Sequence, residues 1–234
     1  MSVIKTKIDN KKNNFDIFYN KCKEPYNNRK YLDLKDSNSN AKKKKKIDYF
    51  HHKVKDLLDI SEVTLKKYIN APYFFTVKHV ITLSSFLKVA PVELFKLIVS
   101  SLEINYTSDN YITIKIEDNI KVKDVSRVNK DRVPDFYTLY NECKELYNEA
   151  YYKENPKLSK KGSDMFQQNI LKIMDIGANT LKKYIASPEV FNVGQVVMLS
   201  KLIQIESDIL FEVIYSTSDS KESVKDYISK ASLV

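Results

Sequence analysis

A chain of 234 residues is long enough to form two domains with cores of their own. Three glycines and six prolines are too few for a glycine-rich enzyme scaffold or for a β-sandwich with many turns. No apolar run is long enough to cross a membrane, which argues against a membrane protein. The formal net charge of +9 favours a polyanionic partner. The N-terminus lacks the apolar core of a signal peptide, so we expect a cytoplasmic protein.

The first part of the chain has the pattern of a tail followed by a set of short helices. The tail covers residues 1–14, and hydrophobic spacing places a first helix from about Phe15 to Tyr26. A polar stretch from Asn27 to Lys46 is expected to form a loop. The remaining helices are expected at about 47–58, from near Ser61 to just before Pro72, along a face from Val77 to Leu87, and around Leu94 to Ile98.

The segment that follows alternates apolar and polar residues. In "NYITIKIEDNIKVKDV", Ile112, Ile114 and Ile116 alternate with polar residues, and Ile120 with Val122 do so after a polar turn. This pattern is typical of a β-hairpin, which would pack the two parts of the chain together or offer an edge for dimerisation. An extended linker over residues 107–134 is the alternative.

The second part of the chain repeats the first. Residues 59–98 align without a gap to residues 175–214, and 17 of these 40 positions are identical. Upstream, "FDIFYNKCKEPYN" from Phe15 matches "FYTLYNECKELYN" from Phe136 after a shift of five residues. A unit of this length indicates two duplicated small domains, 15–106 and 135–218, rather than a solenoid. Residues 219–234 would then form a C-terminal helix or tail.

The positive charge belongs entirely to the first copy. Residues 1–110 hold 21 lysines and arginines against 12 acidic residues, whereas residues 111–234 hold 18 of each. This asymmetry is expected when one half of a protein faces a polyanion, although a lysine-rich solvated surface would give the same count. The two cysteines, Cys22 and Cys143, occupy equivalent positions on the apolar stripe of the first helix, where we expect them to pack in the core.

Helices two to five of each copy carry a family resemblance. The stretches "LLDISEVTLKKYINAPYFFTVKHVITLSSFLKVAPVELFKLI" and "IMDIGANTLKKYIASPEVFNVGQVVMLSKLIQIESDILFEVI" resemble the lambda-repressor/Cro class of helix-turn-helix domains. The resemblance implies a mainly α protein with two tandem five-helix domains, and double-stranded DNA as the partner. It departs from the class at the turn, where glycine is common and this chain has Asp59 and Asp175.

The resemblance also implies that the third helix of each copy enters the major groove. With Leu65 and Ile69 inward, the outward face carries Val63, Lys66, Lys67 and Asn70, after Ser61 at the helix start. The matching face of the second copy carries Asn179, Lys182 and Lys183. Paired lysines suit phosphate contact, Asn179 could pair with adenine and Val63 could touch a thymine methyl. The alternative is the ordinary solvated side of an amphipathic helix.

A run of five lysines precedes the second helix of the first copy only. Lys42, Lys43, Lys44, Lys45 and Lys46 would each neutralise a phosphate of a bound duplex, or else form a solvated loop without a partner.

Two functions from different classes remain open. The sequence shows no catalytic constellation, no glycine-rich phosphate loop and no spacing of metal ligands, so neither an enzyme nor a cofactor is expected. The first hypothesis is a bacterial or phage transcriptional regulator in which the first copy supplies most of the affinity and the second adds selectivity. The second hypothesis is an assembly protein, for example a phage virion or packaging component, whose neutral second copy holds a protein partner or forms a homodimer.

Overall fold

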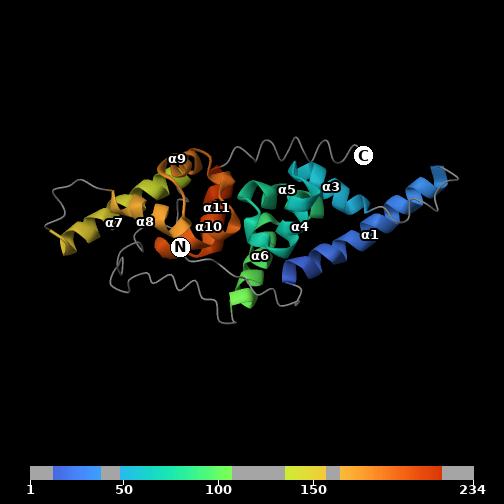
Figure 1. Cartoon of the computed structure of the whole chain (residues 1–234), viewed down its shortest axis with the longest axis horizontal. Coiled ribbons are helices and arrows are strands. Elements are labelled where there is room, and N and C mark those ends of the chain that lie inside the picture. The colour runs from blue at the N-terminus through green and yellow to red at the C-terminus, as the bar shows by residue number, and fades with distance from the viewer. Residues whose placement is uncertain (1–12, 38–47, 107–134, 157–163, 218–234) are drawn as a thin grey trace.

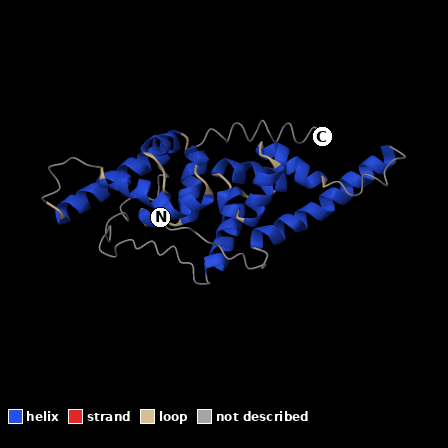
Figure 2. Ribbon diagram, in the orientation of Figure 1, coloured by secondary structure: helices blue, strands red, loops and turns tan. Residues whose placement is uncertain are grey.

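The computed structural model describes residues 13–37, 48–106, 135–156 and 164–217, and these residues are mainly helical. They form ten α-helices and two short 3-10 helices, with one isolated β-bridge and no strand (Figure 2). The predicted mainly α class is therefore confirmed. The predicted hairpin or linker, residues 107–134, lies outside the described residues, as do residues 1–12 and 218–234.

Within the described residues, each copy shows five α-helices and one 3-10 helix in the same order. The elements of the first copy are α1 (Asn14–Ser37), α3 (Tyr49–Leu58), α4 (Glu62–Asn70), η1 (Pro72–Phe74), α5 (Val77–Leu87) and α6 (Pro91–Tyr106). The elements of the second copy are α7 (Phe136–Glu154), α8 (Met165–Met174), α9 (Ala178–Ala186), η4 (Pro188–Val190), α10 (Val193–Leu202) and α11 (Ser207–Thr217).

The turn before α4 explains the departure at Asp59. This residue ends α3 in the left-handed conformation, with φ of 52°, and Asp175 ends α8 with φ of 51°. Aspartate is one of the few residues besides glycine that adopts this conformation at modest cost. The turn therefore keeps the backbone geometry for which a glycine is usual, without needing one.

The prediction of a loop from Asn27 to Lys46 is wrong for residues 27–37, which belong to the first helix. Helix α1 continues through the polar stretch as far as Ser37 and projects away from the other helices (Figure 1). Asn27 lies inside this helix and holds it against α3. Its amide oxygen accepts a hydrogen bond from Phe50 N at 2.7 Å, and its amide nitrogen donates to Asp48 Oδ1 at 3.0 Å. Over residues 27–33 the polarity reflects a partly to fully exposed helix surface rather than a loop.

The same polar contact recurs in the second copy. Asn148, the counterpart of Asn27, accepts a hydrogen bond from Phe166 N at 3.0 Å and donates to Asp164 Oδ1 at 3.2 Å. In both copies the aspartate also caps the following helix and pairs with a lysine of the first helix, Lys23 at 2.5 Å and Lys144 at 3.1 Å. The long first helix is thereby fixed against the second in each unit.

The two cysteines pack as expected. Cys143 is buried and Cys22 is partly buried, and both contact the hydrophobic core. Burial, with a smaller contribution from the charge of Glu142, raises the pKa of the Cys143 thiol to about 12, so this thiol stays protonated at neutral pH.

The two copies meet across an approximate two-fold axis. Val77 N donates to Phe191 O and Val193 N donates to Phe75 O, each at 2.9 Å, and Thr76 forms an antiparallel bridge with Asn192. Thr76 pairs with its own counterpart Asn192, and the two hydrogen bonds on either side of this bridge are equivalent to each other. Helices α1 and α7 accordingly extend in opposite directions from the centre (Figure 1).

Aromatic packing completes this junction. Phe95 of α6 and its counterpart Phe211 of α11 are fully buried, and their rings stack with centroids 4.4 Å apart and an interplanar angle of 23°. The short helix η1 contacts α10, and η4 contacts α5 in the same way. Because each 3-10 helix directly follows α4 or α9, these two exposed helices are held in fixed positions relative to the axis.

Candidate nucleic-acid interface

Helix α4 presents the face that the sequence predicts. Leu65 and Ile69 are buried, whereas Val63, Lys66, Lys67 and Asn70 are exposed. Ser61 caps the helix, because its hydroxyl oxygen accepts a hydrogen bond from Thr64 N at 3.1 Å. Val63 is the most exposed large hydrophobic residue of the described chain, at 79 % of its surface.

The charges on α4 are less free than the sequence implies. Lys66 Nζ lies 2.6 Å from Glu62 Oε1, one helical turn earlier, and this exposed carboxylate also sits on the outward side. Hydrogen bonding from Lys66 lowers the pKa of Glu62 below its usual value, so the carboxylate is charged at neutral pH. Lys67 Nζ lies 4.2 Å from the centroid of the Phe74 ring, a cation–π contact that orients the side chain.

The end of α4 is held by a residue that sequence reasoning missed. The Asn13 side chain is buried, and its amide nitrogen donates to Ile69 O at 3.1 Å and to Asn70 O at 3.2 Å. Its amide oxygen accepts from Asp16 N at 2.7 Å, which caps the start of α1. Asn13 thus ties the first helix to the last turn of α4. Its place in the sequence, just ahead of an apolar helix, is the only signal that could have found it.

Helix α9 presents the cleaner positive face. Asn179, Lys182 and Lys183 are all exposed, as expected, and Leu181 is buried beneath them. Ala178 stands where α4 has Glu62, so Lys182 has no carboxylate one turn earlier. Gly177 begins this helix without a side-chain cap, and a Cβ added there would meet no atom within 4 Å. Helix α9 therefore carries two lysines without an acidic residue one turn earlier, although the second copy is neutral overall.

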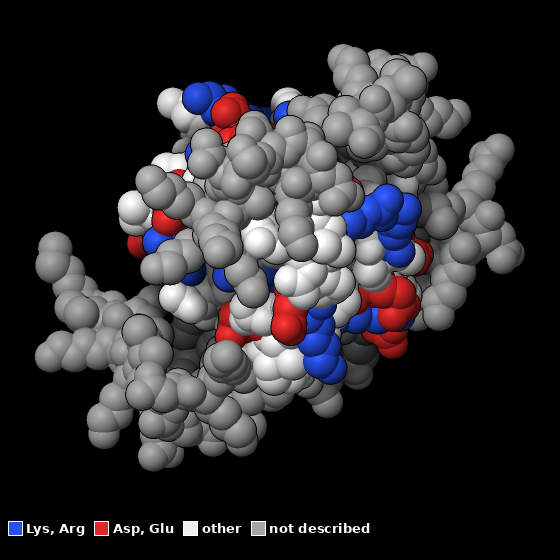
Figure 3. Space-filling model, turned by 90° about the vertical axis from the view of Figure 1, so that its right-hand side faces the viewer, with Lys and Arg blue, Asp and Glu red and all other residues white. Residues whose placement is uncertain are grey.

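Most of the positive excess lies elsewhere. Residues 1–12 and 38–47 together contain nine lysines and one aspartate. The lysine run Lys42 to Lys46 is part of this excess and lies outside the described residues. On the end of the molecule formed by the first copy, the described side chains of both signs are mixed (Figure 3). The charge asymmetry between the copies is therefore carried mainly by these two segments, and not by the face of α4.

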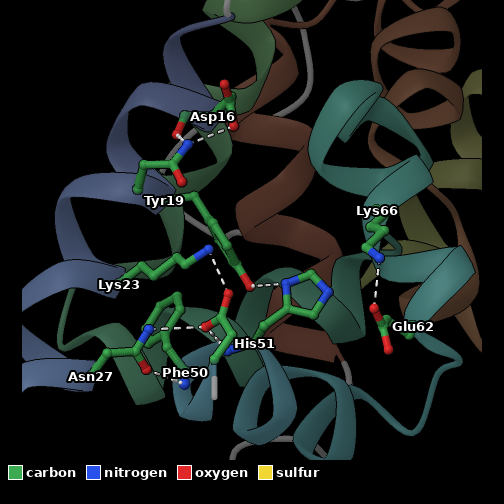
Figure 4. A network of polar contacts seen from close by, with 10 residues as sticks. Asp16, Tyr19, Lys23, Asn27, Phe50, His51, Glu62 and Lys66 are labelled. Atoms are coloured by element: carbon green, nitrogen blue, oxygen red, sulfur yellow. Dashed lines mark hydrogen bonds and ion pairs between the residues drawn. The ribbon is translucent and has the colours of Figure 1, made fainter. Parts of the chain in front are cut away.

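A polar network links α1 and α3 next to this face, and the Lys66–Glu62 pair of α4 lies beside it (Figure 4). The Tyr19 hydroxyl and His51 Nδ1 lie 3.2 Å apart and share a hydrogen bond. Asp48 accepts from the Asn27 amide and pairs with Lys23. Burial alone would raise the pKa of Asp48, but hydrogen bonds from Lys23, Asn27 and His51 N outweigh it and lower the pKa. The aspartate is therefore charged and holds the helices in register.

A shallow cavity of about 330 Å³ opens beside this network. Its lining combines acidic, basic and histidine side chains, among them Asp16, Lys23, His52, Glu62 and Lys66. No group of three or more potential metal ligands occurs among the described residues. Most of the lining residues already have structural partners, although the buried Nε2 atom of His51 has none, and the cavity gives no catalytic arrangement of nucleophile, base and orienting group.

The start of α5 contains a half-buried histidine with a defined structural role. In a capping box, His79 N donates to Thr76 Oγ1 at 3.1 Å, and His79 Nδ1 accepts from Thr76 N at 3.3 Å. Only a neutral ring offers this acceptor. Burial, with a smaller effect of Lys78, lowers the pKa of His79 from 6.5 to about 4. The second copy builds the same box from Asn192 and Gln195, whose amide does not titrate.

The histidine predicts a pH dependence of stability. Because the folded-state pKa of about 4 lies below the unfolded value of 6.5, stability is full above pH 6.5 and falls as the pH drops towards 4. The loss should reach up to about 3 kcal/mol from this group alone. Urea unfolding at a series of pH values would measure it, with His79→Gln as the matched variant that copies the second box. Parallel pH curves for the two proteins would contradict this role of His79.

Comparison with known proteins does not assign the chain to a family. No protein-family model, no curated protein and no solved structure matches it. Within the described ranges, no helix is long and apolar enough to cross a membrane. Support for a function therefore comes from the geometry of the two copies themselves.

Proposed function

We propose that this protein binds double-stranded DNA through two helix-turn-helix units and acts as a transcriptional regulator. In each unit the first of the two helices would be α3 or α8, the turn would be centred on Asp59 or Asp175, and the recognition helix would be α4 or α9. The supporting geometry is a tight left-handed turn followed by a nine-residue helix whose outward face is polar and exposed.

One observation carries this proposal. The same lysine pair, Lys66 with Lys67 and Lys182 with Lys183, is exposed at the same positions of two equivalent helices. The inward residues of these helices serve the core and would recur for that reason alone. The buried core does not require this exposed pair, whereas contact with the phosphates of two half-sites gives both copies a reason to keep it.

The two copies would contribute to DNA binding differently from what their charge balance implies. Helix α9 offers two lysines and Asn179 without an acidic neighbour, which suits both phosphate contact and hydrogen bonding to an adenine edge. Helix α4 offers Val63 for a thymine methyl and a lysine that is already paired with Glu62. The lysine-rich segments of the first copy would then add electrostatic affinity that is independent of sequence.

A protein–protein assembly module is the second candidate. The exposure of Val63 favours this candidate because a protein partner could bury this apolar side chain, and the adjacent Glu62 carboxylate would repel the phosphates of a duplex. The proposal of a homodimer or another protein partner bound through the second copy belongs to the same candidate.

Salt dependence separates the two candidates. The full chain should bind random 30-base-pair duplexes in fluorescence anisotropy, and log K should fall with log salt at a slope of several units, since each neutralised phosphate contributes about −0.9. Repeated selection from random duplexes should then enrich one sequence. A flat salt dependence, or no binding below micromolar concentrations at low salt, would reject DNA as the partner and leave assembly.

A further inference from the structure

The two copies are joined as the two halves of a symmetric dimer usually are. The paired hydrogen bonds of Val77 and Val193, the bridge between Thr76 and Asn192, and the Phe95–Phe211 stack all relate equivalent positions. Such an interface, in which the same patch of each partner is used, defines a two-fold axis. Here the axis lies inside one chain.

A two-fold rotation fixes how α4 and α9 are presented. It leaves every pair of equivalent atoms at the same height along the axis, so the two helices lie at one level on opposite sides of it. If the outward face of one points along the axis, the other points the same way. Duplex DNA also has two-fold axes, perpendicular to its own helix axis, and a two-fold pair of recognition helices matches two inverted half-sites.

The halves are nevertheless not interchangeable. Lys96 Nζ pairs with Asp208 Oδ2 at 3.2 Å across the junction, but the equivalent positions in the opposite sense are Glu212 and Val92, which cannot form an ion pair. Gly194 is the second difference: a Cβ there would lie 3.6 Å from Tyr73 Cβ.

The counterpart of Gly194 is Lys78, and the counterpart of Tyr73 is Glu189. Two first copies would therefore place Tyr73 against a lysine, and two second copies would lose both the tyrosine and the ion pair. The junction is complementary between unlike copies.

We infer that a single chain occupies one inverted pair of unlike half-sites on duplex DNA, with α4 over one half and α9 over the other. This inference rests on the proposed DNA-binding function. The two halves of one chain would then take the place of the two subunits of a homodimer. Because the halves differ, the target would be an imperfect palindrome. The half-sites should lie about 10 base pairs apart, one turn of the duplex.

The helix faces predict where the palindrome breaks. Val63 and Asn179 occupy the same position of the two helices. A valine side chain fits a thymine methyl, whereas an asparagine amide can bond bidentately to adenine. The two half-sites should therefore differ at the base pair that faces this position. Elsewhere they should share contacts, because Lys66 with Lys67 and Lys182 with Lys183 are alike.

The test uses the full chain and duplexes selected with it. The enriched site should consist of two inverted, non-identical halves, and native mass spectrometry should show one chain per duplex. Inserting five base pairs between the halves turns one to the opposite side of the DNA and should weaken binding at least a hundredfold. An insertion of ten base pairs keeps the sides but stretches the separation, which the fixed junction should not tolerate either.

A reciprocal pair of variants tests the assignment of the halves. Val63→Asn should make the selected site more symmetric, with both halves now preferring the base pair favoured by Asn179. Asn179→Val, the matched control, should make it symmetric in the opposite sense. Two chains per duplex, indifference to the spacing, or an unchanged site for both variants would overturn the inference while leaving DNA binding intact. Absence of any salt-dependent duplex binding would instead overturn the proposed function and this inference together.

Discussion

Replacing Lys66, Lys67, Lys182 and Lys183 together by alanine should lower the affinity for duplex DNA about four-thousandfold at 0.1 M salt. Each phosphate contact contributes a log–log slope of about −0.9, which amounts to about eightfold at that concentration, so four contacts account for the estimate. All four side chains are exposed, and none contributes to the buried core. The fold should therefore be unaffected, and the whole loss should appear in binding.

The measurement is a salt titration of anisotropy for the wild type, the fourfold variant and each pair alone. The slope should fall by roughly four units in the fourfold variant. Because Lys66 already pairs with Glu62, the Lys66→Ala, Lys67→Ala pair should lose less than the Lys182→Ala, Lys183→Ala pair. Lys21→Ala with Lys153→Ala, two exposed lysines of α1 and α7, is the control for net charge. Equal losses in control and test variants would show non-specific attraction without an interface.

A single substitution separates affinity from selectivity on α9. Asn179→Ala should leave binding to random duplexes nearly intact, since it removes no charge. On the selected site it should cost about 1–3 kcal/mol, the usual worth of one bidentate base contact. If α9 instead holds a protein partner, the selected site should not distinguish Asn179→Ala from the wild type.

The second large effect is expected at the junction of the copies. Phe95→Ala or Phe211→Ala should destabilise the protein by about 3–5 kcal/mol, the usual cost of deleting a fully buried phenylalanine. In a chain of this size that corresponds to a fall in Tm of about 10 °C, measurable by calorimetry or circular dichroism. Phe95→Leu keeps an apolar side chain of similar bulk and should cost less than about 1.5 kcal/mol.

The double variant distinguishes the junction from the two cores. Because the rings stack on each other at 4.4 Å, Phe95→Ala and Phe211→Ala should be non-additive, with a coupling of about 0.5–3 kcal/mol. Losses that add within about 0.5 kcal/mol would mean that the two rings do not pack together in solution. A separate, early melting of one copy would mean the same.

The helices and their faces could largely be predicted from the sequence. The spacing of Leu65 and Ile69 placed the inward side of α4, and the same spacing placed the outward lysines. The repeat in register made the prediction for α9 follow from that for α4. Local periodicity suffices here because a short helix buries one stripe, whichever neighbour covers it. Whether these faces bind DNA stays a prediction.

The polar residues were less predictable from the sequence. Asn27 and Asn13 were assigned to a loop and a tail, yet each satisfies backbone groups of a distant helix. Their partners are separated from them by 23 and 56 residues, so no window of sequence contains both ends of the contact. The alignment of the two copies shows that Asn27 recurs as Asn148, but only the packed structure shows that both hold the first helix against the next one.

By itself the sequence determined that the chain is a duplicated set of amphipathic helices, because burial imposes its period on each helix separately. Only the tertiary structure decided how the two sets meet. Any duplicated domain keeps similar residues at equivalent positions, so the likeness of Thr76 to Asn192, or of Phe95 to Phe211, cannot reveal that these counterparts touch. The two-fold junction arises from matching surfaces over two whole units, and it is this junction that sets α4 and α9 at one level on either side of a single axis.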